Sequence, residues 1–439
     1  MSGAENSPLP RRAKAAPGPD PMPAKTLTAS AHPGSAGTPA PPLSPGLAVL
    51  LLALLMSIQP VTTDLYLPAL PALTRSLGAP VSAGQLTLSA LLLAFGSSQL
   101  LWGPLSDRFG RRPILLIGLA LYVLASVGSA LAPDMALLVL WRTLQGAAMG
   151  AAVMCARAMV RDLYTPLAGA RAMSRALTGL GIIACLCAPI GGALTEALGW
   201  RAALLALTAY GCATLFMVWR HMPETLAQPN PRALQPATFA RNWALVLRSP
   251  TFWAFSLLTT ASYGGLFTFL ASSSFVYIEV LGLTRTQYGL ALLSTAAFYL
   301  LGTLLCRRLL ARWSVAQTVA FGAALSLAGG LLTLAIAWAG WHSTATLLPP
   351  FYLFMIGHGI HQPCGQSGAV GPFPQAAGVA SALNGFMMML AAFAIGLWLG
   401  RALDGSIWPL MHGVALWSVL LAGVAWTLVQ RHGEPAHAR

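Results

Sequence analysis

Charged side chains are scarce in this sequence. Only 8% of its 439 residues are Asp, Glu, Lys or Arg, and only 11 are acidic, whereas 56% are hydrophobic. A soluble globular domain carries about 25% charged residues, so this composition excludes an ordinary soluble protein. We therefore predict an integral membrane protein.

Several signatures of chemistry are also missing. The sequence has no G-x-x-x-x-G-K-[ST] loop for a nucleotide phosphate, no G-x-S-x-G and no H-E-x-x-H. Its six cysteines lie in or beside apolar segments without C-x-x-C spacing, which indicates small helix residues rather than a metal or disulfide site. We expect no metal, no other cofactor and no enzymatic activity, so any work would be driven by an ion or solute gradient.

Long apolar runs recur from Leu47 to Val429. Each is near the ~20 residues that an α-helix needs to cross about 30 Å of hydrocarbon, and none alternates as a membrane barrel strand would. We predict an all-α membrane protein with twelve transmembrane helices. The predicted spans are residues 47–68, 84–105, 113–132, 136–156, 173–195, 201–219, 251–273, 288–306, 315–338, 346–364, 378–399 and 406–428.

The longest internal polar stretch lies between spans six and seven and divides the chain into two halves of six spans each. The halves echo each other weakly, since GPLSDRFGRR after the second span aligns with GTLLCRRLLAR after the eighth. Two six-helix repeats are a recurrent plan of secondary transporters, with the substrate site between them. The predicted parts are a disordered tail at 1–45, a six-helix bundle at 46–219, a linker at 220–249, a second six-helix bundle at 250–429 and a tail at 430–439.

The formal net charge of +14 could indicate a nucleic-acid partner, but the places of the charges argue against one. With the N-terminus inside, most of the 25 basic residues, Arg157 among them, fall in cytoplasmic segments, as the positive-inside rule requires. We expect a multi-pass protein of the inner (plasma) membrane with both termini in the cytoplasm. Its expected partners are the lipid bilayer, protons and small molecules, and no nucleic acid.

Asp64 and Arg142 are the charges placed well inside predicted spans. A carboxylate or guanidinium in hydrocarbon costs at least a few kcal/mol, so each is a functional candidate. Counted from the outer ends of spans one and four, both lie six residues, about 9 Å, deep. We expect the two charges to be neighbours. They would form either a static ion pair between the two helices or a site where proton and substrate compete for Asp64, with Arg142 adjusting its proton affinity.

The motif GPLSDRFGRRPILLIG follows span two. It resembles the loop signature of the major facilitator superfamily, G-x-L-a-D-r-x-G-r-r. The resemblance implies two pseudo-symmetric six-helix bundles and a gating loop that latches them in the outward-facing state. The alternative is a basic cytoplasmic loop with an incidental aspartate. The matching residues are Gly103, Leu105, Asp107, Arg108, Gly110, Arg111 and Arg112.

Two further motifs lie in spans four and five. WRTLQGAAMG resembles the R-x-x-q-G-x-g signature of the proton-coupled branch of this superfamily. APIGG resembles the end of the antiporter signature G-P-x-x-G-G, with alanine at the first position, and the alternative is ordinary packing of small residues. The matching residues are Arg142, Gln145 and Gly146 in span four, and Pro189, Gly191 and Gly192 in span five.

With TDLYLPALP and GVASALNGF, these motifs resemble the bicyclomycin-resistance-like (Bcr/CflA) branch of drug:proton antiporters. The resemblance extends over all twelve spans and is stronger in the N-terminal half. It implies multidrug efflux, a proton-coupled export of small amphipathic drugs or toxic compounds. We expect the protein to function as a monomer.

The C-terminal half has no charge within a predicted span, so binding there would depend on neutral groups. His358 and His361 are three residues apart and are expected to share a helix face, in a cavity or in helix contacts. Met149 and Met387–Met389 are expected to be packing residues. The candidates for the cavity are Gln59, Tyr66, Tyr263, Tyr299, His358, His361, Gln362 and Asn384.

The sequence thus predicts a twelve-helix antiporter that exchanges inward protons for outward amphipathic compounds. Asp64 would hold the proton or a cationic cargo, the Asp107 loop would gate, and the helix at Pro189 would bend. One alternative is an exporter of a specific metabolite or amino-acid derivative with the same fold. The other is a non-transporting sensor or membrane enzyme.

Overall fold

The computed structural model describes residues 44–164, 166–226, 228–229, 231 and 235–433. The predicted tail at 1–45 therefore lies outside the described residues except for its last two. The predicted tail at 430–439 is described only to residue 433, and its first residues belong to a short helix, α15 (Leu428–His432).

The described chain is almost entirely helical and contains no strand. The N-terminal half comprises α1 (Pro45–Asp64), α2 (Leu70–Ser76), α3 (Val81–Phe109), α4 (Arg111–Leu131), α5 (Met135–Leu163), α6 (Pro166–Leu198) and α7 (Trp200–His221). Helix α8 (Pro236–Leu247) lies in the predicted linker. The C-terminal half comprises α9 (Pro250–Ser274), α10 (Arg285–Leu310), α11 (Val315–Trp338), α12 (Thr344–Val370), α13 (Ala377–Ala402), α14 (Trp408–Trp426) and α15.

Eleven helical segments of the described residues are long and apolar enough to cross a membrane. The predicted tenth span corresponds to α12, which has 27 residues but carries two histidines, two glutamines and three prolines. These residues make α12 less apolar, yet it packs against α9, α10 and α11 as a member of the bundle. The predicted all-helical membrane fold is confirmed.

Most helices extend beyond the predicted spans. Helix α5 continues to Leu163 and α6 begins at Pro166, whereas the apolar runs end at 156 and begin at 173. Hydropathy marks the part of a helix in hydrocarbon, but backbone hydrogen bonding continues through polar turns beyond it. As a result, Arg157 lies inside a helix and not in a cytoplasmic loop as predicted.

Capping residues and glycine turns determine where several helices begin and end. Asp134, Thr284 and Ser314 accept hydrogen bonds from the first turns of α5, α10 and α11. Gly110 joins α3 to α4 with φ 101°, a conformation that side chains with a Cβ rarely adopt. These turns let successive helices run in opposite directions.

The turns therefore lie at two ends of the bundle. We call the end with the α3–α4 turn the Asp107 end, and the end with the α6–α7 turn the Glu196 end.

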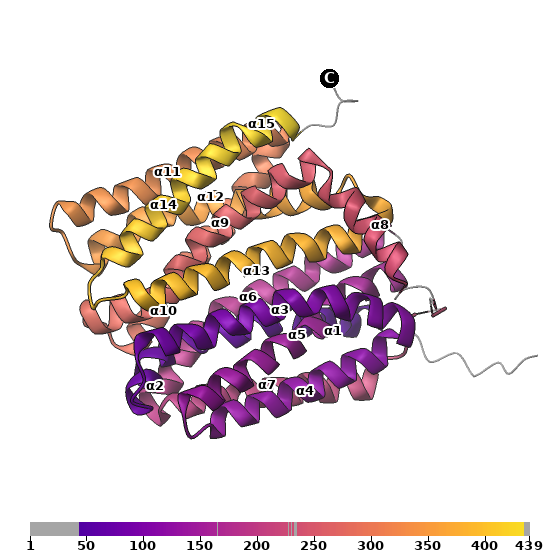
Figure 1. The fold of residues 1–439 in the computed structure, drawn as a ribbon, viewed down its shortest axis with the longest axis horizontal. Coiled ribbons are helices and arrows are strands. Elements are labelled where there is room, and N and C mark those ends of the chain that lie inside the picture. Colours follow the sequence, from indigo (N-terminus) through magenta and orange to yellow (C-terminus); the bar gives the residue numbers. More distant parts are fainter. Residues whose placement is uncertain (1–43, 165, 227, 230, 232–234, 434–439) are drawn as a thin grey trace, which may run out of the picture. The chain divides into compact units, whose positions relative to one another are not determined.

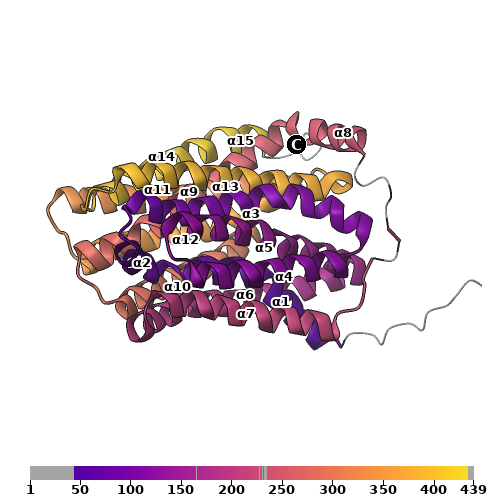
Figure 2. The ribbon, with the colours of Figure 1, turned by 60° about the horizontal axis from the view of Figure 1, so that its bottom comes forward.

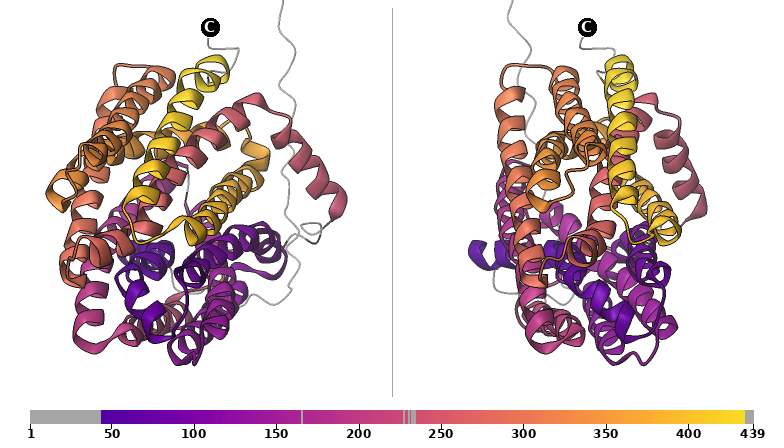
Figure 3. Two further views of the ribbon diagram at one scale, coloured as in Figure 1. Left: turned by 60° about the vertical axis from the view of Figure 1, so that its left-hand side comes forward. Right: turned by 90° about the vertical axis from the view of Figure 1, so that its left-hand side faces the viewer.

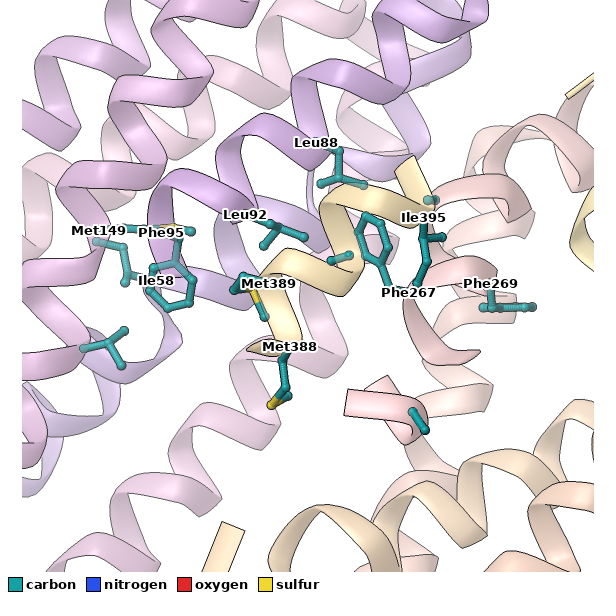
Figure 4. Close-up of a cluster of buried hydrophobic side chains, with 14 of the residues drawn as sticks. Ile58, Leu88, Leu92, Phe95, Met149, Phe267, Phe269, Met388, Met389 and Ile395 are labelled. Carbon is teal, nitrogen blue, oxygen red and sulfur yellow. The ribbon is translucent and has the colours of Figure 1, made fainter. Parts of the chain in front are cut away.

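The two halves meet along two pairs of helices, α3 with α13 and α6 with α10. Figure 1 shows α13 beside α3, and Figures 2 and 3 show the N-terminal half in indigo and magenta against the orange and yellow C-terminal half. At the first pair, Gly96 of α3 faces the side chain of Met389. Figure 4 shows Met389 on α13 near Leu92 and Phe95 of α3. Apolar contacts therefore hold the halves together near mid-bundle.

Candidate functional site

A cavity of about 620 Å³ lies between the two halves. Helices α1, α3, α5 and α6 line it from one half, and α9, α10, α12 and α13 line it from the other. Its walls are mostly apolar, with Leu and Met the most frequent side chains, and they carry several polar groups, as expected for a site that takes amphipathic compounds. The predicted residues that line it are Gln59, Asp64, Tyr263, Tyr299, His358, Gln362 and Asn384.

Two predicted cavity residues are elsewhere. Tyr66 is fully buried, and its hydroxyl hydrogen-bonds Thr87 Oγ1 at 2.7 Å within the N-terminal half. His361 is also fully buried and turns toward α11, where its Nε2 lies 3.3 Å from the Val319 carbonyl and beside Gly322. Two residues that are three apart on a helix point in directions about 60° apart, so His358 reaches the cavity while His361 does not. The predictions for Tyr66 and His361 as cavity residues are wrong.

Asp64 is the last residue of α1 and lines the cavity. Its Oδ1 accepts a hydrogen bond of 2.8 Å from Thr63 Oγ1, and the Gln59 Nε2 reaches the same hydroxyl at 3.5 Å. Asp64 has no ion-pair partner among the described residues. Of the acids that the structure describes, Asp64 is the one that lines this cavity.

Arg142 does not form the expected ion pair with Asp64. Its guanidinium donates to Gln145 Oε1 at 2.6 Å and to the Thr62 backbone carbonyl at 3.1 Å, and it lies over the Tyr66 ring at 4.2 Å. Arg142 is fully buried, so these oxygens and the π face replace the water it has lost. Arg142 does lie beside the end of α1, as its depth predicts, but the Asp64 carboxylate turns toward the cavity.

The rest of the span-four motif belongs to the same buried network. Gln145 accepts from Arg142 and donates to Ser126 Oγ at 2.6 Å on α4. Gly146 packs against the backbone carbonyl of Leu91 on α3, where a Cβ would collide. The motif thus fixes α5 to three neighbouring helices and supports the end of α1 that carries Asp64.

The loop motif forms an ion-pair cluster at the Asp107 end. Arg111 is buried and contacts Asp107 Oδ1 at 2.6 Å and Asp162 Oδ2 at 3.0 Å. The Glu224 carboxylate accepts the backbone N–H groups of Arg111 at 2.9 Å and Arg112 at 3.1 Å, which stabilises the N-terminus of α4.

The other matching residues of the loop motif lie in different surroundings, and only Arg108 of them is exposed. Gly110 makes the turn, and Gly103 lines a second cavity. All these ion pairs lie within the N-terminal half. Asp162 and Glu224 were not predicted as partners of this loop, although both follow spans that end on the same side of the membrane as the loop.

The span-five motif closes the Glu196 end of the cavity. Gly191 packs on the Leu65 carbonyl at the end of α1, and Gly192 packs on the Arg285 carbonyl at the start of α10. The backbone beside Pro189 contacts Gly289 of α10. Small residues let these helices touch backbone to backbone.

Polar contacts join the halves at the same end. Glu196 Oε2 accepts from Thr286 Oγ1 at 2.6 Å and from its backbone N–H at 3.1 Å. Arg75 and Glu279 form an ion pair of 2.5 Å. In contrast, the lining of the cavity reaches Val370, the last residue of α12, at the Asp107 end. The cavity is therefore closed at the Glu196 end and extends toward the Asp107 end.

Gly192→Leu is expected to open the Glu196 end. The new side chain would overlap the backbone of α10, and overpacking costs about 1–3 kcal/mol, which shifts a conformational equilibrium by about fivefold to a hundredfold. Cys185 lines the cavity and serves as the reporter, in a Cys212→Ser background because Cys212 is exposed. A membrane-impermeant maleimide supplied on the Glu196 side should label Cys185 faster in the variant.

The matched control is Gly423→Leu, because no atom lies near the site of a Cβ there. Unchanged labelling in Gly192→Leu, or an equal increase in Gly423→Leu, would contradict this assignment of the closed end.

Several cavity residues were not predicted. Met388 and Met389 line the cavity as well as pack, and flexible methionine walls suit cargo of varied shape. The helical spacing of these residues from Asn384 and Gly385 was the available signal. The polar lining residues that were not predicted include Gln99, Arg157, Thr295, Gln366 and Ser381. No group of three or more His, Cys, Asp or Glu side chains in the described chain could hold a metal ion.

The family profile described as Major Facilitator Superfamily matches residues 50–397. The chain belongs to this superfamily. Multidrug resistance protein D of Escherichia coli is 29% identical over 391 residues, which cover 88% of this chain and 98% of that protein. The chloramphenicol resistance protein of Pseudomonas aeruginosa is 30% identical over 386 residues, covering 87% and 86%.

A bicyclomycin resistance protein homolog of Haemophilus influenzae is 29% identical over 242 residues, 55% of this chain and 61% of that one. The predicted bicyclomycin-resistance-like branch is confirmed. Among solved structures, a D-xylose-proton symporter superposes with a TM-score of 0.69 at 17% identity, covering 89% of this chain and 98% of that one. It shows the fold. The chain is a multi-pass membrane transporter for small molecules.

Proposed function

We propose that this transporter exports small amphipathic compounds across the inner membrane in exchange for protons. The proposal depends mainly on Asp64, a carboxylate that has no cationic partner among the described residues and lies at the closed end of a mostly apolar cavity. Such a group binds either a proton or a cationic cargo, because a bare charge in this surrounding is costly. Relatives named for multidrug, chloramphenicol and bicyclomycin resistance support toxic compounds as cargo rather than one metabolite.

We assign the Asp107 end to the cytoplasm, because the basic residues of the α3–α4 turn lie there. Both termini are then cytoplasmic, and the structure is open toward the cytoplasm. Cargo enters from this side and displaces the proton from Asp64. The protein acts as a monomer, without a cofactor or enzymatic step, and the proton gradient supplies the energy.

Closure of the cytoplasmic end would involve Asp107. A cavity of about 350 Å³ separates the Asp107 region from the start of α13, at Ala377 and Gly378. The N-cap of α13, Ala376, offers no side chain to the free backbone N–H groups. A helix N-terminus attracts a carboxylate, so approach of the halves would let Asp107 contact α13 and stabilise the outward-facing state.

The test is transport by the purified protein in liposomes with an acidic interior. Ethidium, a cation, and chloramphenicol, a neutral compound, are expected to accumulate inside the liposomes. Protein molecules inserted with the cytoplasmic face outward would carry them in. Accumulation should stop when a protonophore removes the pH gradient. Equal uptake without the gradient would refute proton coupling, and no movement of any probe would favour a sensor.

A further inference from the structure

The central cavity and the cavity beside Asp107 have three lining residues in common. The central cavity and the 350 Å³ cavity at the Asp107 end share Gln99 of α3, Arg157 of α5 and Ser381 of α13 in their linings. These residues come from both halves. We call them the neck, because any compound that moves between the two cavities passes them.

Arg157 places a guanidinium in the neck, and it has no acidic partner in the part of the chain that the structure describes. Its Nη1 donates to Ser381 Oγ at 3.2 Å, and no described carboxylate forms an ion pair with it. Asp107 lines the same cavity but is engaged by Arg111 at 2.6 Å. A neutral hydroxyl is a weak partner for a partly buried cation, so Arg157 retains donors for an anionic or electron-rich group.

A second free donor lies at a similar depth. Gln362 lines the central cavity and is 8% exposed, and its Nε2 finds no hydrogen-bond partner among the residues described. Gln362 is eight residues, about 12 Å, from the end of α12, and Arg157 is six residues, about 9 Å, from the end of α5. The part of the cavity nearest the neck therefore offers hydrogen-bond donors, whereas Asp64 offers an acceptor at the closed end.

Arg157 and Asp64 are too far apart for one small molecule to contact both at once. Arg142 contacts the Thr62 carbonyl of α1, two residues before Asp64, and so marks the depth of Asp64. Arg157 follows Arg142 by fifteen residues, which is about 22 Å along α5. A cargo would meet Arg157 first and Asp64 later. An arginine fork binds a carboxylate through two hydrogen bonds, so Arg157 can distinguish carboxylates from their esters.

We propose that Arg157 is a specificity residue that captures an anionic group of the cargo at the neck. The cargo then includes amphipathic carboxylates and zwitterions, in addition to cations and neutral compounds. This inference rests on the proposed export function and adds a cargo class to it.

The test compares ciprofloxacin, a zwitterion at neutral pH, with its methyl ester, a cation on the same scaffold. KM for each is measured in liposomes with an acidic interior for wild type, Arg157→Gln and Arg157→Lys. The preference for acid over ester is expected to fall about tenfold or more in Arg157→Gln. Arg157→Lys keeps the charge but not the fork, so its preference should be intermediate. Arg307→Gln, exposed on α10 and outside both cavities, should leave the ratio unchanged.

The outcomes separate this inference from the proposed function. Equal loss for both probes in Arg157→Gln, or an unchanged ratio in both Arg157 variants, would overturn the role of Arg157. A wild-type protein that carries the ester and excludes the acid would also overturn it, while the proposed export function stands. A wild-type protein that moves neither these probes nor ethidium would refute the export function itself.

Discussion

Asp64→Asn is expected to abolish proton-coupled export while the protein stays folded. Asparagine has nearly the same shape and can still accept from Thr63 Oγ1, but it neither releases a proton nor carries a charge. Purified wild-type protein in detergent should release protons when ethidium is added, because the cation displaces the proton from the carboxylate. The variant should release none, and its transport should fall to the level of protein-free liposomes.

The control for this experiment is Asp404→Asn. Asp404 is exposed and hydrogen-bonds Ser406 at the Glu196 end, outside both cavities. It should release protons as the wild type does. Equal proton release from Asp64→Asn and wild type would show that the proton binds at a residue other than Asp64. His358 would be the next candidate, because it lines the cavity and its Nδ1 lies 2.8 Å from Ser262 Oγ.

Arg142→Gln is expected to cost stability and transport together. The change removes two charged hydrogen bonds, to Thr62 and Gln145, and the contact with the Tyr66 ring. Charged hydrogen bonds contribute about 1.5–3 kcal/mol each in soluble proteins and less between membrane helices, so a loss of about 2 kcal/mol is expected. Tm in detergent should fall, and transport should fall tenfold or more, because the end of α1 loses its anchor.

Arg142→Lys separates charge from geometry. A lysine ammonium keeps the charge but lacks the planar fork that reaches the carbonyl and the amide at once, so an intermediate Tm is expected. Arg108→Gln, exposed on the loop, should leave Tm unchanged. A wild-type Tm in Arg142→Gln would show that the network does not support α1. Full activity in Arg142→Lys would show that charge alone is sufficient.

The course of the chain follows from local properties of the sequence. Apolar runs of membrane length predict the helices, because each helix must satisfy its own backbone hydrogen bonds in lipid. The loop and span-five motifs likewise predict sites of turning and close packing, and Gly110 and Gly192 act in this way. Asp64 was found because a lone acid in an apolar run is costly wherever the helix sits.

The sequence by itself determined the fold class, the family and the axial depth of the charged residues, since depth depends only on the rise of about 1.5 Å per residue. Only the tertiary structure decided which side chains face one another. The rotation of each helix depends on contacts such as Gly146 with Leu91 and Gly322 with His361, which join segments far apart in the chain. For that reason Arg142 binds a carbonyl instead of Asp64, and Arg157 lies in the neck.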